Sequence, residues 1–286
     1  QYMSQFIPGQ PTITVEYMTG AGSINAANYV YNVAPKDGTV IAIVDQTAPM
    51  HQLLGGGAQF RSSALQWLGS AAHSNGLIDT WYTSGINTIE DAQKREVTIG
   101  GVATTADSYV FPTISNGVLG TKFKSILGYP DGGQTDLAME RGEVEGNGAS
   151  SWFGLQTRDR SWIDEKKINL LVQIGVEKEH DLPNVPLLGD LVKDDEGRRI
   201  SDLISVSTSI GYAYWVAPGV PADRIALLRT AFDAALKDTQ ALADTKKRGL
   251  ELRPQSGAEI GAQVKKISDT PQNVLDRMAK MLGMRE

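Results

Sequence analysis

Residues 12–44 decide the fold, and they read TITVEYMTGAGSINAANYVYNVAPKDGTVIAIV. In residues 13–17 apolar and polar side chains alternate, which is the pattern of a half-buried strand. A glycine turn follows at residues 20–23, and the apolar residues of 24–31 then recur at helical spacing. Residues 39–44 form a nearly continuous apolar run, typical of a strand buried on both faces of a parallel sheet. The stretch therefore predicts strand, glycine turn, helix and strand, the repeating unit of an α/β fold.

Similar units recur further along the chain. Strands are predicted at residues 97–99, 123–127 and 168–174, and the first two run into polar, glycine-containing turns followed by helical patterns. The last part of the chain reads as a strand at 212–216 and then long helices. This repetition predicts an open, mostly parallel sheet with helices on both faces. A length of 286 residues suits two such lobes of roughly 100 to 150 residues each.

The composition excludes several classes of function. A net charge of −6 and a pI near 5.2 argue against nucleic acid and anionic membranes as partners, because both attract basic faces. The longest apolar runs, such as residues 41–44 and 170–172, are far shorter than the roughly 20 residues of a membrane-spanning helix. The sequence has no cysteine, which removes disulfides, thiolate nucleophiles and Cys-ligated zinc together.

Known catalytic motifs fail at specific positions. His51, His73 and His180 are far apart and form no metal-ligand spacing. Residues 148–152 resemble a serine nucleophile elbow until the fifth position, which is tryptophan instead of glycine. Residues 20–25 begin like a dinucleotide-binding fingerprint but carry asparagine where its third glycine belongs. We therefore predict no catalytic residue, no metal and no cofactor.

Polar turns rich in Gly, Ser, Thr and Asn follow several predicted strands. At the carboxyl edge of a parallel sheet, such turns present backbone N–H groups at helix starts, where an anion is favoured. Each turn alone is equally explained by the ordinary needs of glycine turns and helix caps. Together they predict a cleft that binds an anion, and Trp152, directly after the last turn, is predicted to wall it. The turns are residues 20–25, 45–47, 100–107, 129–135 and 147–151.

Six blocks of sequence, in this order, resemble the receptors of tripartite tricarboxylate transporters, the TctC or Bug family. Gly20-Ala21-Gly22-Ser23 is similar to that family's Pro-Gly-Ala-Gly-Gly block, and Ala34-Pro35-Lys36-Asp37-Gly38-Thr39 to its Ala-Pro-Asp-Gly-Tyr-Thr block. Four further blocks, at residues 100–105, 128–133, 182–187 and 215–221, are similar to its later turns and crossings. Each block alone is unspecific, but their order covers nearly the whole chain.

The resemblance implies a two-lobed type II periplasmic-binding-protein fold, each lobe a mostly parallel sheet flanked by helices. Lobe I is expected at residues 1–85 and 212–286, and lobe II at residues 86–211, with hinge segments near 84–96 and 206–214. It further implies a periplasmic, monomeric receptor that closes around a small organic acid, a di- or tricarboxylate or an aromatic carboxylate. The partners implied are the integral membrane permease subunits to which the acid is delivered.

The resemblance also assigns candidate ligand-binding residues, to which Trp152 is added from its place after a polar turn. From lobe I they are Gly20, Ala21, Gly22, Ser23, Asp45, Gln46 and Thr47. From lobe II they are Ala103, Thr104, Thr105, Asp131, Gly132 and Gly133.

Three features depart from the family pattern. The family's first strand and its Pro-Ala-Gly-Gly loop are expected before Gln1 and are not in this numbering. Ser23 replaces a glycine, and Asp131 stands near where many members have lysine. Because a carboxylate repels another nearby, Asp131 is expected to cap the following helix, to bind a hydroxyl or amine of the ligand, or to face away.

Two other functions stay open from the sequence. An α/β enzyme acting on a small organic acid would need a base, for which Asp45, Asp107 and Asp131 are the candidates. A ligand-sensing regulatory receptor with the same lobes would need a kinase partner or a DNA-binding segment, and the sequence shows no helix-turn-helix pattern.

Overall fold

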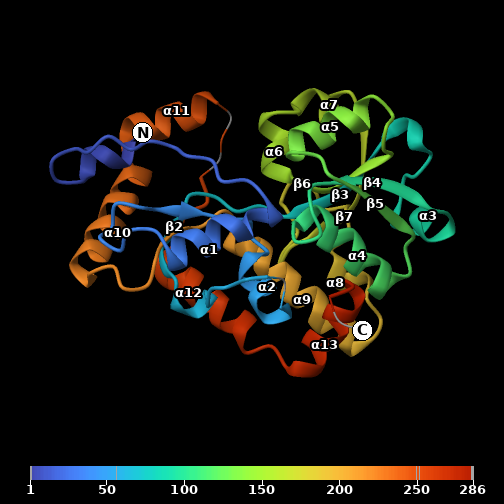
Figure 1. Cartoon of the computed structure of the whole chain (residues 1–286). Helices are drawn as coiled ribbons and strands as arrows, with labels where there is room; N and C mark the ends of the chain where they lie inside the picture. The colour runs from blue at the N-terminus through green and yellow to red at the C-terminus, as the bar shows by residue number, and fades with distance from the viewer. Residues whose placement is uncertain (1, 56, 249, 251, 285–286) are drawn as a thin grey trace.

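Two β-sheets, each with its own helices, make up the computed structural model, which describes residues 2–55, 57–248, 250 and 252–284 (Figure 1). The four-stranded sheet has the order β1-β8-β2-β9 and the five-stranded sheet the order β5-β4-β6-β3-β7. The strands of the first sheet are β1 (Ala42–Ile43), β2 (Gln66–Ser70), β8 (Tyr214–Val216) and β9 (Gln255–Ser256). Those of the second are β3 (Gly76–Trp81), β4 (Val97–Gly101), β5 (Phe123–Leu127), β6 (Gly146–Ser151) and β7 (Ile168–Ile174).

The helices fall into three groups along the chain. Before β4 lie η1 (Tyr2–Phe6), η2 (Ala21–Ser23), α1 (Ile24–Asn32), α2 (Ala48–Leu54), η3 (Ser62–Ala64), η4 (Tyr82–Ser84) and α3 (Ile89–Lys94). Between β4 and β8 lie α4 (Asp107–Leu119), α5 (Gly132–Glu140), α6 (Trp152–Thr157), α7 (Arg160–Asp164), α8 (Leu188–Leu191) and α9 (Asp195–Ile210). After β8 lie α10 (Ala222–Lys237), α11 (Thr239–Lys247), α12 (Gly257–Ser268) and α13 (Gln272–Met281).

The two-sheet α/β architecture expected from the sequence is present, but the sheets are less parallel than predicted. β4 runs parallel to β5 and β6, whereas β3 runs antiparallel to β6 and β7. The four-stranded sheet is antiparallel, because β8 returns from the other half of the molecule, inserts between β1 and β2, and runs against both.

The strand predicted at residues 13–17 does not form. Val15 is 75% exposed and Tyr17 is 90% exposed, and residues 11–19 belong to no helix or strand. An alternating segment buries one face only when a neighbouring strand fixes it in a sheet, and no described residue pairs with this one. Of the second predicted strand, at residues 39–44, only β1 (Ala42–Ile43) forms a strand.

Two passages of chain join the sheets. Residues 71–75 lead from β2 to β3, and α9 leads back to β8 through Gly211. A Cβ at Gly211 would lie 2.6 Å from the carbonyl oxygen of Ala72, so the two passages are in contact. Residues 84–96, expected to be a hinge, instead contain α3 and precede β4 within the five-stranded half. The division into lobes at 85 and 212 stays a prediction, and the place of β3 favours a first boundary at 71–75.

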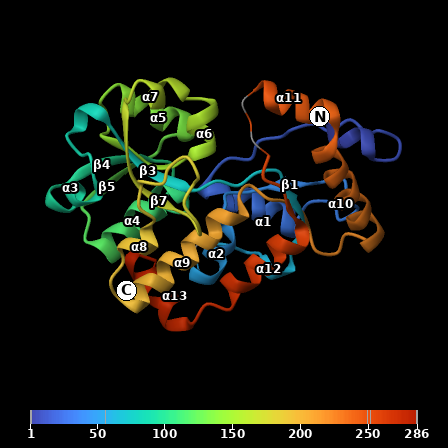
Figure 2. The same cartoon turned by 180° about the vertical axis from the view of Figure 1, so that it is seen from behind.

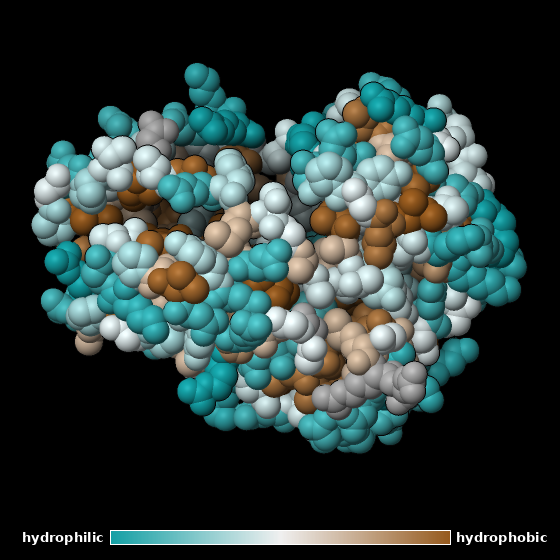
Figure 3. Space-filling view, in the orientation of Figure 1, coloured by the Kyte–Doolittle hydropathy of each residue, from teal (hydrophilic) through white to brown (hydrophobic). Residues whose placement is uncertain are grey.

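The C-terminal helix connects the two halves from below. α13 contacts α2, and it also contacts α4 and α9, as both views show (Figures 1 and 2). A Cβ at Gly117 of α4 would meet the sulfur of Met281 at 2.6 Å, which shows how closely the two helices approach. Opposite this connection, the surface is hollowed between the two halves (Figure 3).

Candidate functional site

A cavity of about 510 Å³ lies between the two halves and is walled by both. Its volume suits a ligand of metabolite size. The four-stranded half contributes Met18, Thr19, Gly20, Ala21, Gly22, Ser23, Asp45 and Tyr212. The five-stranded half contributes Val102, Ala103, Ala106, Asp107, Ser108, Tyr129, Pro130, Asp131, Gly132, Thr135, Asn147 and Ala149.

The turn before α1 has an unusual backbone, because all four residues from Gly20 to Ser23 have positive φ: 111°, 47°, 53° and 70°. Such angles are strained for Ala21 and Ser23 and free for glycine. A Cβ at Gly22 would lie 2.8 Å from the carbonyl carbon and oxygen of Thr105, so only glycine allows this approach between the halves. The turns at 20–23 and 103–105, predicted to share a ligand, therefore meet at one cavity.

Two carboxyl groups, one from each half, lie side by side on the cavity wall. Asp45 Oδ1 accepts hydrogen bonds from the backbone N–H and the hydroxyl of Thr47, at 2.8 and 2.5 Å. Asp107 Oδ1 accepts from the backbone N–H of Ser108 at 2.7 Å, and its Oδ2 accepts from Gln46 Nε2 at 3.2 Å. Gln46 and Thr47, predicted as ligand contacts, are buried and orient the acids from behind the wall.

The environment of this pair opposes two negative charges. Burial raises the pKa of Asp45. Burial and the neighbouring charge of Asp45 raise the pKa of Asp107 well above its ordinary value. Tyr212 is 51% exposed on the same wall, and the charges of Asp107 and Asp45 together with desolvation raise the pKa of its phenol. The site therefore disfavours simultaneous ionisation of the two carboxyl groups.

Asp131 caps a helix, one of the three roles expected for it. Its side chain accepts a hydrogen bond from the backbone N–H of Gln134 at 2.9 Å, which makes it the N-cap of α5. Asp131 and Gly132 lie on the cavity wall, whereas Gly133 does not. In the other turn, Ala103 lies on the wall, Thr104 is exposed, and Thr105 is 9% exposed.

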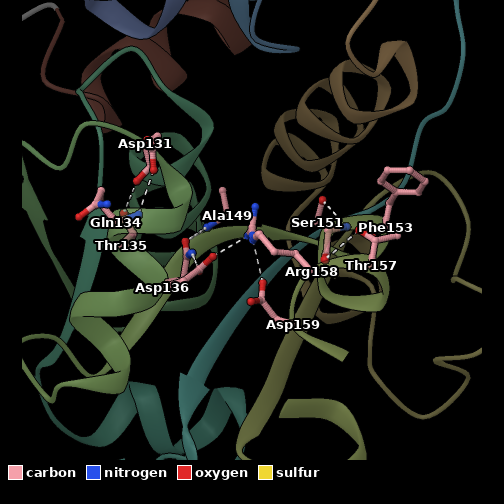
Figure 4. A network of polar contacts seen from close by, with 12 residues as sticks. Asp131, Gln134, Thr135, Asp136, Ala149, Ser151, Phe153, Thr157, Arg158 and Asp159 are labelled. Atoms are coloured by element: carbon pink, nitrogen blue, oxygen red, sulfur yellow. Dashed lines mark hydrogen bonds and ion pairs between the residues drawn. The ribbon is translucent and has the colours of Figure 1, made fainter. Parts of the chain in front are cut away.

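Behind the wall formed by Asn147 and Ala149 is a network of charged groups (Figure 4). Asn147 Nδ2 donates to Asp136 Oδ1 at 2.7 Å, and its Oδ1 accepts from the backbone N–H of Ala149 at 3.0 Å. Arg158 binds Asp136 Oδ2 at 2.5 Å and Asp159 Oδ2 at 3.0 Å. Burial raises the pKa of Asp136. The network fixes the position of Asn147. No sequence motif identifies Arg158 as part of the network.

Trp152 does not line this cavity. It is 5% exposed and packs in a hydrophobic cluster with Leu77 and Trp162. It also borders a separate hollow that holds His73, Glu179 and Arg253. The side chain of Trp152, at the start of α6, packs in the core. The prediction that it walls this cleft is therefore wrong.

Several wall residues are not predicted from the sequence. Tyr212 reads there as a strand residue. Tyr129 and Asp107 lie in two of the predicted polar turns but are not among the named ligand contacts, and Asp107 is also a candidate base of an enzyme. The turn at 147–151 is among the predicted polar turns, and two of its residues, Asn147 and Ala149, lie on the wall. An aspartate at the first position of a helix after a polar turn is the one signal that marks Asp107, because that position faces the carboxyl edge of the sheet.

The described residues hold no group of three or more His, Asp or Glu side chains arranged for a metal ion. Among the same residues, no helix is both long and apolar enough to cross a membrane.

The two-sheet fold with an interposed cavity is shared with solved structures of periplasmic binding proteins. The sequence itself matches no protein-family model and no curated protein. The structure of the periplasmic binding protein BugD is similar over 99% of this chain and 89% of its own, with a TM-score of 0.71 and 16% identity. MatC from Rhodopseudomonas palustris with bound malate is similar over 98% and 90%, with a TM-score of 0.71 and 16% identity.

A TctC solute-binding protein from Polaromonas is similar over 99% of this chain and 89% of its own, with a TM-score of 0.62 and 14% identity. These structural neighbours are TctC- and Bug-type binding proteins, and the chain has their fold along nearly its whole length. The resemblance found in the sequence is confirmed at the level of the fold.

Proposed function

We propose that the chain is a solute-binding receptor that holds a small organic acid in the cavity between its two sheets. The observation that carries this proposal is the shared wall: the start of α1 from one half meets the start of α4 from the other across a cavity of about 510 Å³. The start of α1 has no capping side chain, and such a helix start attracts an anion through its unpaired N–H groups and the helix dipole. The fold shared with MatC, which carries malate, supports the same class of ligand.

The mechanism follows from a wall divided between two halves. A ligand that contacts both halves binds the closed form more tightly than the open one, and so shifts the population towards closure. The adjoining passages at 71–75 and Gly211 are the natural hinge. In this proposal the chain performs no chemistry of its own and delivers the acid, as a periplasmic monomer, to membrane permease subunits.

Thermal-shift screening against a panel of organic acids tests the proposal. A ligand that binds only the folded state adds about 2.7 kcal/mol to the free energy of unfolding when its concentration is a hundred times Kd, and it therefore raises the melting temperature. We expect at least one small acid to raise it, and no bound acid to be turned over when followed by mass spectrometry. Failure of every acid in the panel to bind would contradict the proposed function.

A further inference from the structure

We propose that the organic acid bound in this cavity also carries a protonated amine, so that the ligand is an amino acid or a similar small ammonium carboxylate, held at its ammonium by Asp45 and Asp107. This inference rests on the proposed function and narrows its ligand class.

The helix starts around the cavity already have anions of their own. Asp107 is the first residue of α4 and accepts the backbone N–H of Ser108. Asp131 caps α5, and Asp45 accepts the backbone N–H of Thr47 at the start of α2. A ligand carboxylate placed at any of these three starts would face a carboxylate of the protein instead of free N–H groups.

The charges on the wall point to a cation. Three acids line the cavity, and none of its described wall residues is lysine, arginine or histidine. A ligand that brought only negative charge would find no opposite side chain on this wall. An ammonium has three N–H donors, and the two carboxyl groups of Asp45 and Asp107 offer acceptors from both halves, with the Tyr212 hydroxyl on the same wall.

The raised pKa values of the two acids agree with a cationic ligand group. Each carboxyl group lies in an environment that disfavours its charge when the cavity holds no cation. A bound ammonium favours the ionised form of both groups, because its positive charge offsets one of the two negative charges and its N–H groups supply hydrogen bonds in place of water.

One helix start is left for the carboxylate of the ligand. The N-cap of α1 is Ser23, whose side chain makes no capping hydrogen bond, and the residues from Gly20 to Ser23 all line the cavity. Next to Gly22 and behind the cavity wall, Thr105 is nine-tenths buried and its hydroxyl has no hydrogen-bond partner among the described residues. An uncapped helix start facing a pair of acids provides opposite ends for a zwitterion.

Matched ligands that differ only by the amine test this inference. Isothermal titration calorimetry on the wild-type chain would compare aspartate with succinate, glutamate with glutarate, and alanine with propionate. We expect the amino member of at least one pair to bind about ten-fold or more tightly than its partner, as is usual for a charge-assisted hydrogen bond. Equal or tighter binding of the members without an amine would overturn the inference and leave the proposed function standing.

Variants then locate the ammonium. Asp45→Asn and Asp107→Asn are expected to weaken binding of the preferred amino acid by about ten-fold or more each. Asp233→Asn removes an exposed acid on α10 and is the matched control, expected to leave the affinity unchanged. Unchanged affinity in both cavity variants would refute the assigned residues.

Two further outcomes are informative. Amines without a carboxylate, such as ethylamine, are expected to bind weakly, and binding as tight as that of the amino acid would refute the carboxylate end at α1. Absence of binding by any acid, with or without an amine, would overturn both the inference and the proposed function. If a cavity variant fails to fold, as judged by circular dichroism, the comparison of matched ligands on the wild-type chain still decides the question.

Discussion

Gly22 is a point of close approach between the two halves beside the cavity. Its φ is +53°, and an added Cβ would lie only 2.8 Å from the Thr105 carbonyl, so both its backbone and its surroundings require glycine. We predict that Gly22→Ala lowers the free energy of unfolding by about 1 kcal/mol for the left-handed backbone and by about 1–3 kcal/mol more for the clash. Urea denaturation measures the loss, and titration with the preferred ligand should show weaker binding.

Gly120→Ala is the matched control for this change. Gly120 has a φ of +73°, and a Cβ there meets no atom within 4 Å, so it isolates the backbone cost. Equal losses in the two variants would show that the halves do not press together at Gly22 in solution.

His51, which is fully buried on α2, makes the free energy of unfolding depend on pH. Burial lowers its pKa from the ordinary 6.5 to about 4, so the unfolded chain binds a proton between these values and the folded chain does not. Stability from this residue is therefore intact above pH 6.5 and is lost as the pH falls towards 4, by roughly 3 kcal/mol in all.

The measurement is the difference in unfolding free energy between the wild type and His51→Leu, taken at pH 7 and at pH 4.5. All other ionisable groups titrate in both proteins, so their contributions cancel in this difference. We expect the difference to shift in favour of the variant at the lower pH. A difference that does not change with pH would mean that His51 is already protonated, or free to become so, in the folded state.

Residues differ in how far their roles can be read from sequence. The capping role of Asp131 is among those predicted, because an aspartate before a glycine-rich helix start has a local signature. The pairing of Asp45 with Asp107 is not, since 62 positions of sequence separate them (107 − 45) and only the meeting of two halves brings them together.

Among the elements, the segment before the first glycine turn is the clearest failure of pattern reading. Ile13, Val15 and Tyr17 alternate as in a strand, yet all three are exposed. We predict that the backbone amides of residues 12–19 exchange with solvent within seconds at neutral pH, because none of them donates a hydrogen bond within the described chain. Amides of β4, paired on both sides, should be protected by several orders of magnitude.

Hydrogen-exchange mass spectrometry compares the two segments directly. Slow exchange in residues 12–19 would show that the segment pairs with another strand in solution, for example that of a second copy, and the monomer would then be in doubt.

The strands that the sequence predicts and those that it does not differ in composition. β4, β5 and β7 carry the branched and apolar residues that identify strands, and each is predicted within a few positions. β6 has the sequence GNGASS, which is typical of a turn. Its glycines are needed for close approach, since a Cβ at Gly146 would lie 2.3 Å from the Asp79 carbonyl and one at Gly148 2.2 Å from that of Ser108. The mostly parallel strand direction predicted for both sheets holds only for part of the five-stranded sheet, because side-chain periodicity is the same in parallel and antiparallel sheets.

For the whole molecule, the order of sequence blocks predicts a fold that its individual residues do not. The two sheets and the cavity between the predicted turns follow from that order, whereas the place of α13 does not. α13 is amphipathic and packs on α4 of the opposite half, a contact that depends on the relative placement of the halves. Because α13 connects the halves on one side, the proposed closure would take place at the cavity on the other.

We propose that Gly211 is the hinge residue on which closure depends. Its φ of +61° and ψ of −154° lie in a region that glycine alone adopts readily, and its neighbour across the hinge is the Ala72 carbonyl, 2.6 Å from any added Cβ. We predict that Gly211→Ala costs about 1–3 kcal/mol in backbone strain and separates the two passages, so that the halves no longer close fully on a ligand.

Small-angle scattering with and without saturating ligand measures the closure, with Gly120→Ala again as the control for backbone cost. We expect the wild type and the control to contract and Gly211→Ala to contract less. If Gly211→Ala contracts as the wild type does, the hinge lies elsewhere, and if no protein contracts, the ligand is captured without movement of the halves.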